Sequence, residues 1–139
     1  MTQHVRDIMT KDLVTVAPLT SVVDVAQLMR REDIGDVLVV EDGHLRGMVT
    51  DRDLVVRVMA EGGNPGDRTV ASACSEDLLT VGPGDTVGDV IGLMREHAVR
   101  RVPVVEGDRP VGIVSLGDLA IERDPGSALG DISAARPDG

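Results

Sequence analysis

Residues 37–56 read VLVVEDGHLRGMVTDRDLVV, and residues 102–121 read VPVVEGDRPVGIVSLGDLAI. In both stretches an apolar run is followed by a polar turn and a second apolar run that contains a glycine. A hydroxyl residue then stands three places before an aspartate. This pattern predicts two strands joined by a short turn and leading into a helix. The same structural element is therefore encoded twice in the chain.

The similarity extends well beyond these two stretches. At an offset of 65 residues, positions 5–56 align without a gap to positions 70–121, and 20 of the 52 paired residues are identical. Identity over so long a stretch is not an effect of composition, so the chain is a tandem duplication. Two copies are too few for a solenoid. We therefore expect a pseudo-two-fold pair that buries a shared face.

Each copy predicts the element order strand, helix, strand, strand, helix. In the first copy the three strands are expected at 14–16, 37–40 and 45–49, and in the second at 79–81, 102–105 and 111–114. Ser21 is expected to cap the first helix, and a second helix should begin after Thr50. We assign residues 5–62 to the first repeat, 63–69 to a Gly- and Pro-rich linker, 70–124 to the second repeat and 125–139 to a partly flexible tail.

Composition narrows the classes of function. The net charge is −10, and the chain contains no Phe, Tyr or Trp. This composition argues against a nucleic-acid binder, which would need a basic face or aromatic stacking platforms. The negative charge also disfavours binding to an anionic membrane surface. The single cysteine, Cys74, excludes an intramolecular disulfide and a multi-cysteine zinc site. With no signal pattern and no long apolar run, we expect a cytoplasmic protein without nucleic-acid or membrane partners.

The strongest candidate for a ligand site is the motif that joins the third strand to the second helix. It runs from Gly47 to Asp53 in the first copy and from Gly112 to Asp118 in the second. The glycine allows a ligand to approach the backbone closely. The hydroxyl at the helix start lies beside unpaired N–H groups that favour an anion. The carboxylate can accept hydrogen bonds from a ribose diol. The same spacing also fits a helix capping box. The chain holds four such tetrads, Ser21/Asp24, Thr50/Asp53, Thr86/Asp89 and Ser115/Asp118, so spacing alone leaves both interpretations open.

The duplication, this motif and the apolar-Pro-Val-Val strand at 102–105 together resemble the CBS domain pair, also called the Bateman module. The resemblance covers residues 5–123 and implies an α/β fold of two β-α-β-β-α repeats packed through their sheets, with ligand clefts between the repeats. The first copy departs from the family strand pattern at Leu38, where the second copy has Pro103. In the family the motif hydroxyl and aspartate hold phosphate and ribose, while first-strand backbone meets the base. Carried over, this implies ligand-binding roles for Thr15, Gly47, Thr50, Asp53, Thr80, Gly112, Ser115 and Asp118.

The resemblance also implies a regulatory protein rather than an enzyme. The expected ligand is an adenosine compound such as AMP, ADP or ATP, with no required cofactor, no metal and no catalytic residue. A homodimer and a separate effector protein are the expected macromolecular partners. Arg101 enters the second strand of copy two where copy one has Asp36, and basic residues at this place in related modules often reach ligand phosphates. The alternative is a ligand-free scaffold whose motif acts only as a helix cap.

Overall fold

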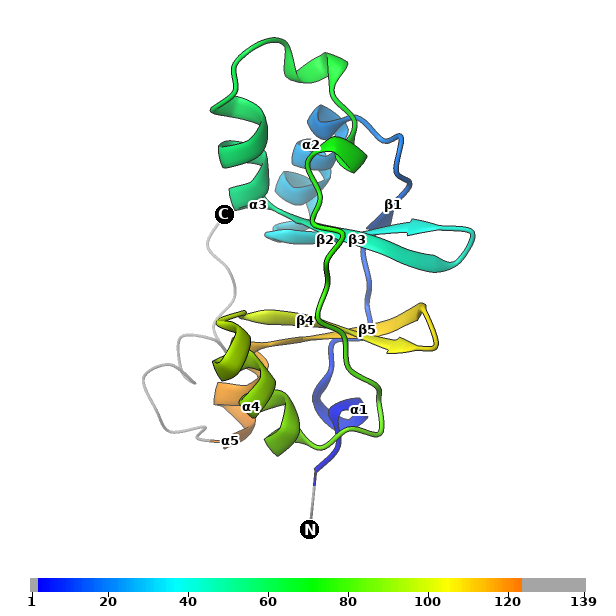
Figure 1. Cartoon of the computed structure of the whole chain (residues 1–139), viewed down its shortest axis with the longest axis vertical. Helices are drawn as coiled ribbons and strands as arrows, with labels where there is room; N and C mark the ends of the chain where they lie inside the picture. The colour runs from blue at the N-terminus through cyan, green and yellow to red at the C-terminus, as the bar shows by residue number, and fades with distance from the viewer. Residues whose placement is uncertain (1–2, 124–139) are drawn as a thin grey trace. The chain divides into compact units, whose positions relative to one another are not determined.

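The chain passes twice between two structural units. The structure, a computed structural model, describes residues 3–123 (Figure 1). The central unit comprises Val14–Leu78, and the terminal unit combines residues 3–13 with residues 79–123. The α/β class expected from the sequence is confirmed, since each unit holds a small sheet with helices. The unit boundaries differ from the repeat boundaries because the first residues of each repeat lie in the unit of the other.

The central unit is built on a three-stranded sheet with the order β1-β2-β3. Strand β1 (Thr15–Val16) runs parallel to β2 (Asp36–Glu41), which pairs antiparallel with β3 (His44–Thr50). Helix α2 (Val22–Glu32) connects β1 to β2. After β3 come a single turn of α-helix, α3 (Asp51–Asp53), the π-helix η1 (Leu54–Met59) and the 3₁₀ turns η2 (Pro65–Asp67) and η3 (Val70–Ser72).

Local chemistry explains where these elements begin and turn. Ser21 Oγ accepts a hydrogen bond from Asp24 N at 3.2 Å, which confirms the predicted cap of α2. In the turn between β2 and β3, Asp42 and Gly43 have φ values of 54° and 81°. Positive φ at both central residues matches the twist of a two-residue hairpin, and Asp-Gly is one of the sequences that adopt it readily.

The terminal unit repeats this plan with one change. Helix α1 (Val5–Ile8) precedes α4 (Val87–His97), the antiparallel hairpin of β4 (Arg101–Glu106) and β5 (Arg109–Ser115), and α5 (Leu116–Arg123). The strand expected at 79–81 is reduced to a single parallel bridge between Val81 and Val104. The reason lies in Pro103. In the central unit Leu38 N donates to Val14 O at 3.1 Å, and proline at the matching position has no N–H to donate.

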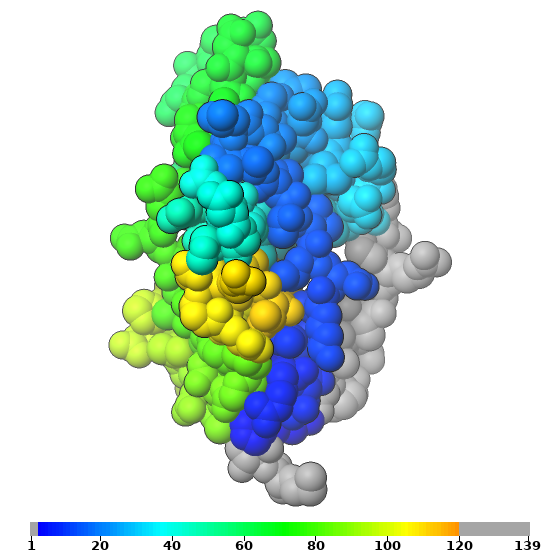
Figure 2. All heavy atoms as spheres, turned by 90° about the vertical axis from the view of Figure 1, so that its right-hand side faces the viewer, coloured from blue at the N-terminus to red at the C-terminus, as the bar shows by residue number. Residues whose placement is uncertain are grey.

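Each unit completes its core with a segment from the start of the other repeat. Val5 of the first repeat is fully buried in the terminal unit, and Val70 of the second repeat is fully buried in the central unit. Backbone hydrogen bonds follow the same exchange. Thr10 and Ile113 exchange two backbone hydrogen bonds, with N···O distances of 2.9 and 3.0 Å. Ser75 and Met48 exchange two in the same way, at 2.9 and 3.1 Å. In Figure 2 the blue N-terminal segment lies beside the yellow β4–β5 hairpin of its own unit.

Candidate functional site

The two motif glycines lie directly under the exchanged segments. A Cβ atom added at Gly47 would come within 2.8 Å of Cys74 Sγ and 2.9 Å of Ser75 O. One added at Gly112 would come within 2.8 Å of Met9 Cγ and 3.1 Å of Thr10 O. A Cβ at Gly47 would therefore force a backbone shift, whereas a Cβ at Gly112 would displace the Met9 side chain and crowd Thr10 O. The sequence analysis expected a ligand to approach the backbone at these glycines, whereas in the structure a segment of the chain itself lies against each of them.

The hydroxyl and aspartate of each motif form a complete capping box. Thr50 Oγ1 accepts from Asp53 N at 3.1 Å, and Thr50 N donates to Asp53 Oδ2 at 2.9 Å. The matching bonds between Ser115 and Asp118 are both 3.0 Å. At the other two tetrads only the hydroxyl takes part, accepting from Asp24 N in one and from Asp89 N in the other. The reciprocal box thus distinguishes the motif pair from the ordinary caps.

The capping box leaves chemistry available for a ligand. A hydroxyl that accepts a hydrogen bond still carries its own proton as a donor, and a carboxylate has about four acceptor positions. In each box the hydroxyl oxygen of Thr50 or Ser115 accepts a hydrogen bond from the backbone N–H of the aspartate. One carboxylate oxygen of the aspartate accepts a bond from the backbone N–H of the hydroxyl residue. Asp53 and Asp118 are only partly buried. The cap and a hydrogen-bonding site for an anion or a diol are therefore compatible.

The remaining candidate residues lie near these boxes within their own units. Arg101 begins β4 and pairs with Ser115 at the end of β5, while Asp36 begins β2 and pairs with Thr50 at the end of β3. Thr15 begins β1 and pairs with Leu38, two residues into β2, so it lies at the same end of the sheet as Asp36. Thr80 precedes the bridge residue Val81. Each motif hydroxyl thus has a charged residue opposite it, with opposite sign in the two units.

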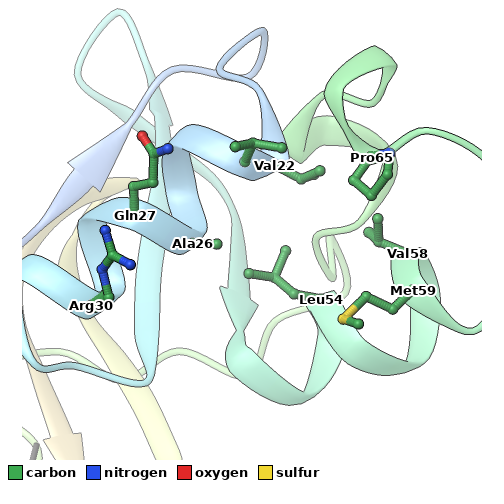
Figure 3. Close-up of a pocket in the computed structure, with 9 residues that line it drawn as sticks. Val22, Ala26, Gln27, Arg30, Leu54, Val58, Met59 and Pro65 are labelled. Carbon is green, nitrogen blue, oxygen red and sulfur yellow. The ribbon is translucent and has the colours of Figure 1, made fainter.

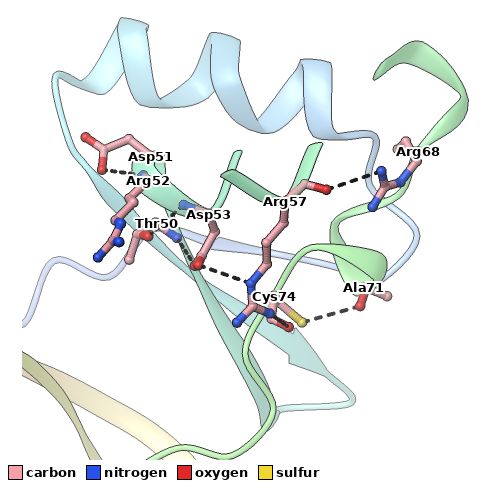
Figure 4. Close-up of polar contacts among 8 residues, drawn as sticks. All are labelled: Thr50, Asp51, Arg52, Asp53, Arg57, Arg68, Ala71 and Cys74. Atoms are coloured by element: carbon pink, nitrogen blue, oxygen red, sulfur yellow. Dashed lines mark hydrogen bonds and ion pairs between the residues drawn. The ribbon is translucent and has the colours of Figure 1, made fainter. Parts of the chain in front are cut away.

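Arg57 is a residue of the site that we did not single out in the sequence. Its Nε lies 3.6 Å from Asp53 Oδ1, and its Nη1 donates to Cys74 O at 3.5 Å (Figure 4). It also lines a polar hollow of about 690 Å³ together with the consecutive residues 74–77. The i,i+4 spacing from Asp53 is the signal that could have identified it.

Cys74 has the surroundings of a structural thiol. It is 8% exposed and belongs to the apolar core of the central unit, where Sγ lies 3.7 Å from Ala71 O. Burial raises the pKa of the thiol, and the nearby Glu76 carboxylate raises it further. A raised pKa lowers the thiolate population at neutral pH, so Cys74 is not activated as a nucleophile.

A second hollow, in the central unit, is apolar. It has a volume of about 410 Å³ and lies between α2 and η1, as Figure 3 shows. Its walls are aliphatic, and Gln27 and Arg30 of α2 supply polar groups at its rim. The lining residues are Val22, Val23, Ala26, Gln27, Arg30, Leu54, Val58, Met59 and Pro65.

Fold and motif together define a tandem pair of β-α-β-β-α repeats with a capped hydroxyl–aspartate motif in each. The CBS domain model matches residues 5–60 and 70–123. The chain therefore belongs to the CBS-domain family, whose tandem pairs are regulatory.

Known proteins resemble this chain over nearly its whole length. The CBS domain-containing protein YhcV of Bacillus subtilis is 40% identical over 133 residues, which cover 93% of this chain and 94% of YhcV. A crystal structure of Hypoxic Response Protein I with two coordinated zinc ions has a TM-score of 0.78 and 35% identity, covering 86% of this chain and 98% of that one. The CBS domain pair of protein MJ0100, solved with 5′-methylthioadenosine and S-adenosyl-L-methionine, shares the fold with a TM-score of 0.80 at 23% identity, over 91% and 100% of the two chains.

Among residues 3–123 no group of three or more His, Cys, Asp or Glu side chains is placed to hold a metal ion. No helix in this range is both long enough and apolar enough to cross a bilayer.

Proposed function

We propose that the chain is a non-catalytic regulatory module that binds an adenosine-containing ligand, AMP, ADP, ATP or a related compound, at its two motif sites. The observation that carries this proposal is the place of Arg101, which pairs across the hairpin with Ser115, the residue whose hydroxyl caps α5. A guanidinium and a hydroxyl donor suit a phosphate, and a partly exposed carboxylate suits a ribose diol. The output would be a shift between conformations or assemblies that bind the ligand with different affinity.

A second copy of the chain is the first partner that we propose. On η1 the large apolar side chains of Val55, Val56 and Met59 are 56%, 52% and 67% exposed. Met59 also lines the apolar hollow between α2 and η1, so exposed apolar side chains and an apolar hollow occur on the same helix. A homodimer that covers this surface would give the module an assembly state for a ligand to modulate, with a separate effector protein as the recipient of the signal.

A ligand-free scaffold remains the second candidate, and a specific observation favours it. Both motif boxes are already closed by reciprocal hydrogen bonds, and both motif glycines are explained by packing against exchanged segments. Under this alternative the motif would hold the two strands, the helix and the exchanged segment together. Its residues would then contribute to stability and to no ligand.

Thermal denaturation in the presence of nucleotides separates the two candidates. Because the chain has no Trp or Tyr, an extrinsic dye should report unfolding. A ligand of the native state stabilises it by about 2.7 kcal/mol at a concentration 100 times its Kd. We expect adenosine compounds to raise the melting temperature more than guanosine compounds; S-adenosylmethionine belongs in the panel because a pair of the same fold was solved with it. A flat response at millimolar concentrations would favour the scaffold.

A further inference from the structure

The Asp53 carboxylate is held from two sides. Its Oδ2 accepts from Thr50 N at 2.9 Å within the capping box. Its Oδ1 faces Arg57 Nε at 3.6 Å, one helical turn further along (Figure 4). If Asp53 accepts a ribose hydroxyl, Oδ1 is the oxygen that the capping box does not use. The arginine therefore lies on the oxygen that a ribose would approach.

Arg57 is itself held in place by the exchanged segment and by a second arginine. Its Nη1 donates to Cys74 O at 3.5 Å, and Cys74 is next to Ser75, which bonds to β3. Arg68 Nη1 donates to Arg57 O at 3.4 Å and pairs with Glu61 Oε2 at 2.9 Å. The guanidinium thus bridges Asp53 and the segment after η3. The guanidinium is placed by the ion pair and by the bond to Cys74 O, while Arg68 holds the backbone carbonyl of the same residue.

The exposure of the two side chains indicates what this pair contributes. The Asp53 side chain is 18% exposed and that of Arg57 is 49% exposed. Ion pairs with one partner this open to water add little to stability. A charge-assisted contact can still fix the direction of a carboxylate, and its geometry matters to a ligand that must meet the same oxygen. Orientation is therefore the larger effect of Arg57.

The second repeat differs at the matching position. At the offset of 65 residues that relates the repeats, Arg57 corresponds to Glu122. A glutamate has no N–H to donate to the carboxylate of Asp118. The two aspartates therefore have the same capping box, but the sequence of the second repeat lacks the arginine that faces Asp53 in the first.

We propose that Arg57 is a positioning residue that orients Asp53 toward a ribose diol, so that the first repeat discriminates ribonucleosides from 2′-deoxyribonucleosides through the Asp53–Arg57 pair. This inference rests on the proposed function, because it assumes that an adenosine compound binds at the motif. It assigns to Arg57 a role in specificity and not in the affinity for phosphate.

The test compares adenosine with 2′-deoxyadenosine by titration calorimetry. Nucleosides carry no phosphate, so the Asp36 charge in the first repeat does not oppose their binding. The full-length chain with Asp118→Asn serves as the background, since this substitution removes the ionised acceptor of the second repeat. A hydrogen bond to a charged group contributes about 1.5–3 kcal/mol, so we expect the background protein to prefer adenosine about tenfold or more.

Three substitutions in this background give the decisive comparison. Arg57→Ala should reduce the preference for adenosine to about threefold or less, whereas Arg57→Lys, which keeps a cation, should retain most of it. Arg52→Ala is the charge-matched control, because Arg52 lies next to Asp53 in α3 and only its backbone N–H bonds to a carboxylate there, that of Asp51. If Arg57→Ala fails to fold, Arg57→Gln, which removes the charge but keeps part of the stem and a polar end, takes its place.

The outcomes separate this inference from the proposed function. An unchanged adenosine preference in Arg57→Ala would overturn the role of Arg57 while leaving nucleoside binding intact. An equal loss in Arg52→Ala would assign the effect to net charge and would also overturn it. If the unmodified chain binds adenosine and the Asp118→Asn variant does not, the first repeat is not a binding site. Absence of binding by the unmodified chain would overturn the proposed function itself.

Discussion

Arg101, the first residue of β4, pairs directly with Ser115, the last residue of β5. In the central unit the same pairing joins Asp36 to Thr50. The two motif hydroxyls therefore have charges of opposite sign across from them. On a chain of net charge −10, a guanidinium at this place would attract a phosphate, and a carboxylate would repel it.

We therefore expect the two motif sites to differ in their affinity for phosphorylated ligands. Titration of the chain with AMP or ATP should reveal one dominant site. Arg101→Ala should weaken it about tenfold or more, because charge-assisted hydrogen bonds contribute about 1.5–3 kcal/mol. Asp36→Ala is the matched control and should leave the dominant site in place. Two equal sites, or the same affinity with and without Arg101, would contradict the asymmetry.

The motif aspartates can be tested against the ordinary caps of the same chain. Asp53→Ala and Asp118→Ala should weaken the binding of an adenosine compound, since each removes a proposed acceptor for ribose. Lost capping contacts should lower the free energy of unfolding by about 0.5–2 kcal/mol. Asp24→Ala and Asp89→Ala are the controls, because both aspartates lie three residues after a capping hydroxyl without the preceding glycine. Equal affinity in all four variants would leave the motif as a cap.

Hydrophobic periodicity predicted most of the fold, and capping chemistry predicted its helix starts. The helix expected between the first two strands of each copy is present as α2 and α4, and the two expected hairpins are present as β2–β3 and β4–β5. The prediction of a strand at 79–81 was wrong in its length, because only a single bridge at Val81 forms. The cause, the missing N–H of Pro103, could have been read from the sequence. The tail assigned to 125–139 lies outside the described residues.

Sequence reasoning could not find what depends on contacts distant along the chain. The exchange that places Val5 and Val70 in the opposite units leaves no local pattern, because both residues are ordinary apolar positions in their own repeats. For the same reason the motif glycines could be read as a ligand approach, although they pack against Cys74 and Met9. The π-helical form of η1 is also invisible in its sequence, which has an ordinary helical pattern.

Glycine substitutions should separate packing from helix propensity. Gly112→Ala should destabilise the protein by about 1–3 kcal/mol, since its Cβ would overlap Met9 and Thr10 O. Gly92→Ala lies within α4, where an added Cβ meets nothing within 4 Å, so it should stabilise the protein by about 0.5–1 kcal/mol. Urea denaturation followed by circular dichroism measures both changes. A stable Gly112→Ala variant would show that the exchanged segment can move aside.

The proposed homodimer depends on the apolar surface of η1. Light scattering at micromolar concentration should return about twice the 14.7 kDa mass of the chain. Met59→Glu should shift it to the monomer, because the side chain is 67% exposed beside the apolar hollow and a charge there would be buried on dimerisation. Leu19→Glu is the control, since Leu19 is 82% exposed but precedes α2. A monomeric unmodified chain would remove this surface as a dimer interface.

The exchange of leading segments predicts that a sequence repeat is not a folding unit. A fragment of residues 1–65 contains the first repeat but lacks Val70, Ala73 and Cys74, which are buried in the core of the central unit. A fragment of residues 14–78 has the same length and keeps them, together with the bond between Ser75 and Met48. Burial of a valine side chain contributes about 1.5–3 kcal/mol, so the missing core is a large part of the 5–15 kcal/mol that typically stabilises a domain. We expect the 14–78 fragment to show a cooperative thermal transition by circular dichroism and the 1–65 fragment to show none. If the two fragments melt alike, or if 1–65 is the more stable, the exchanged segment is dispensable and the repeat folds on its own residues.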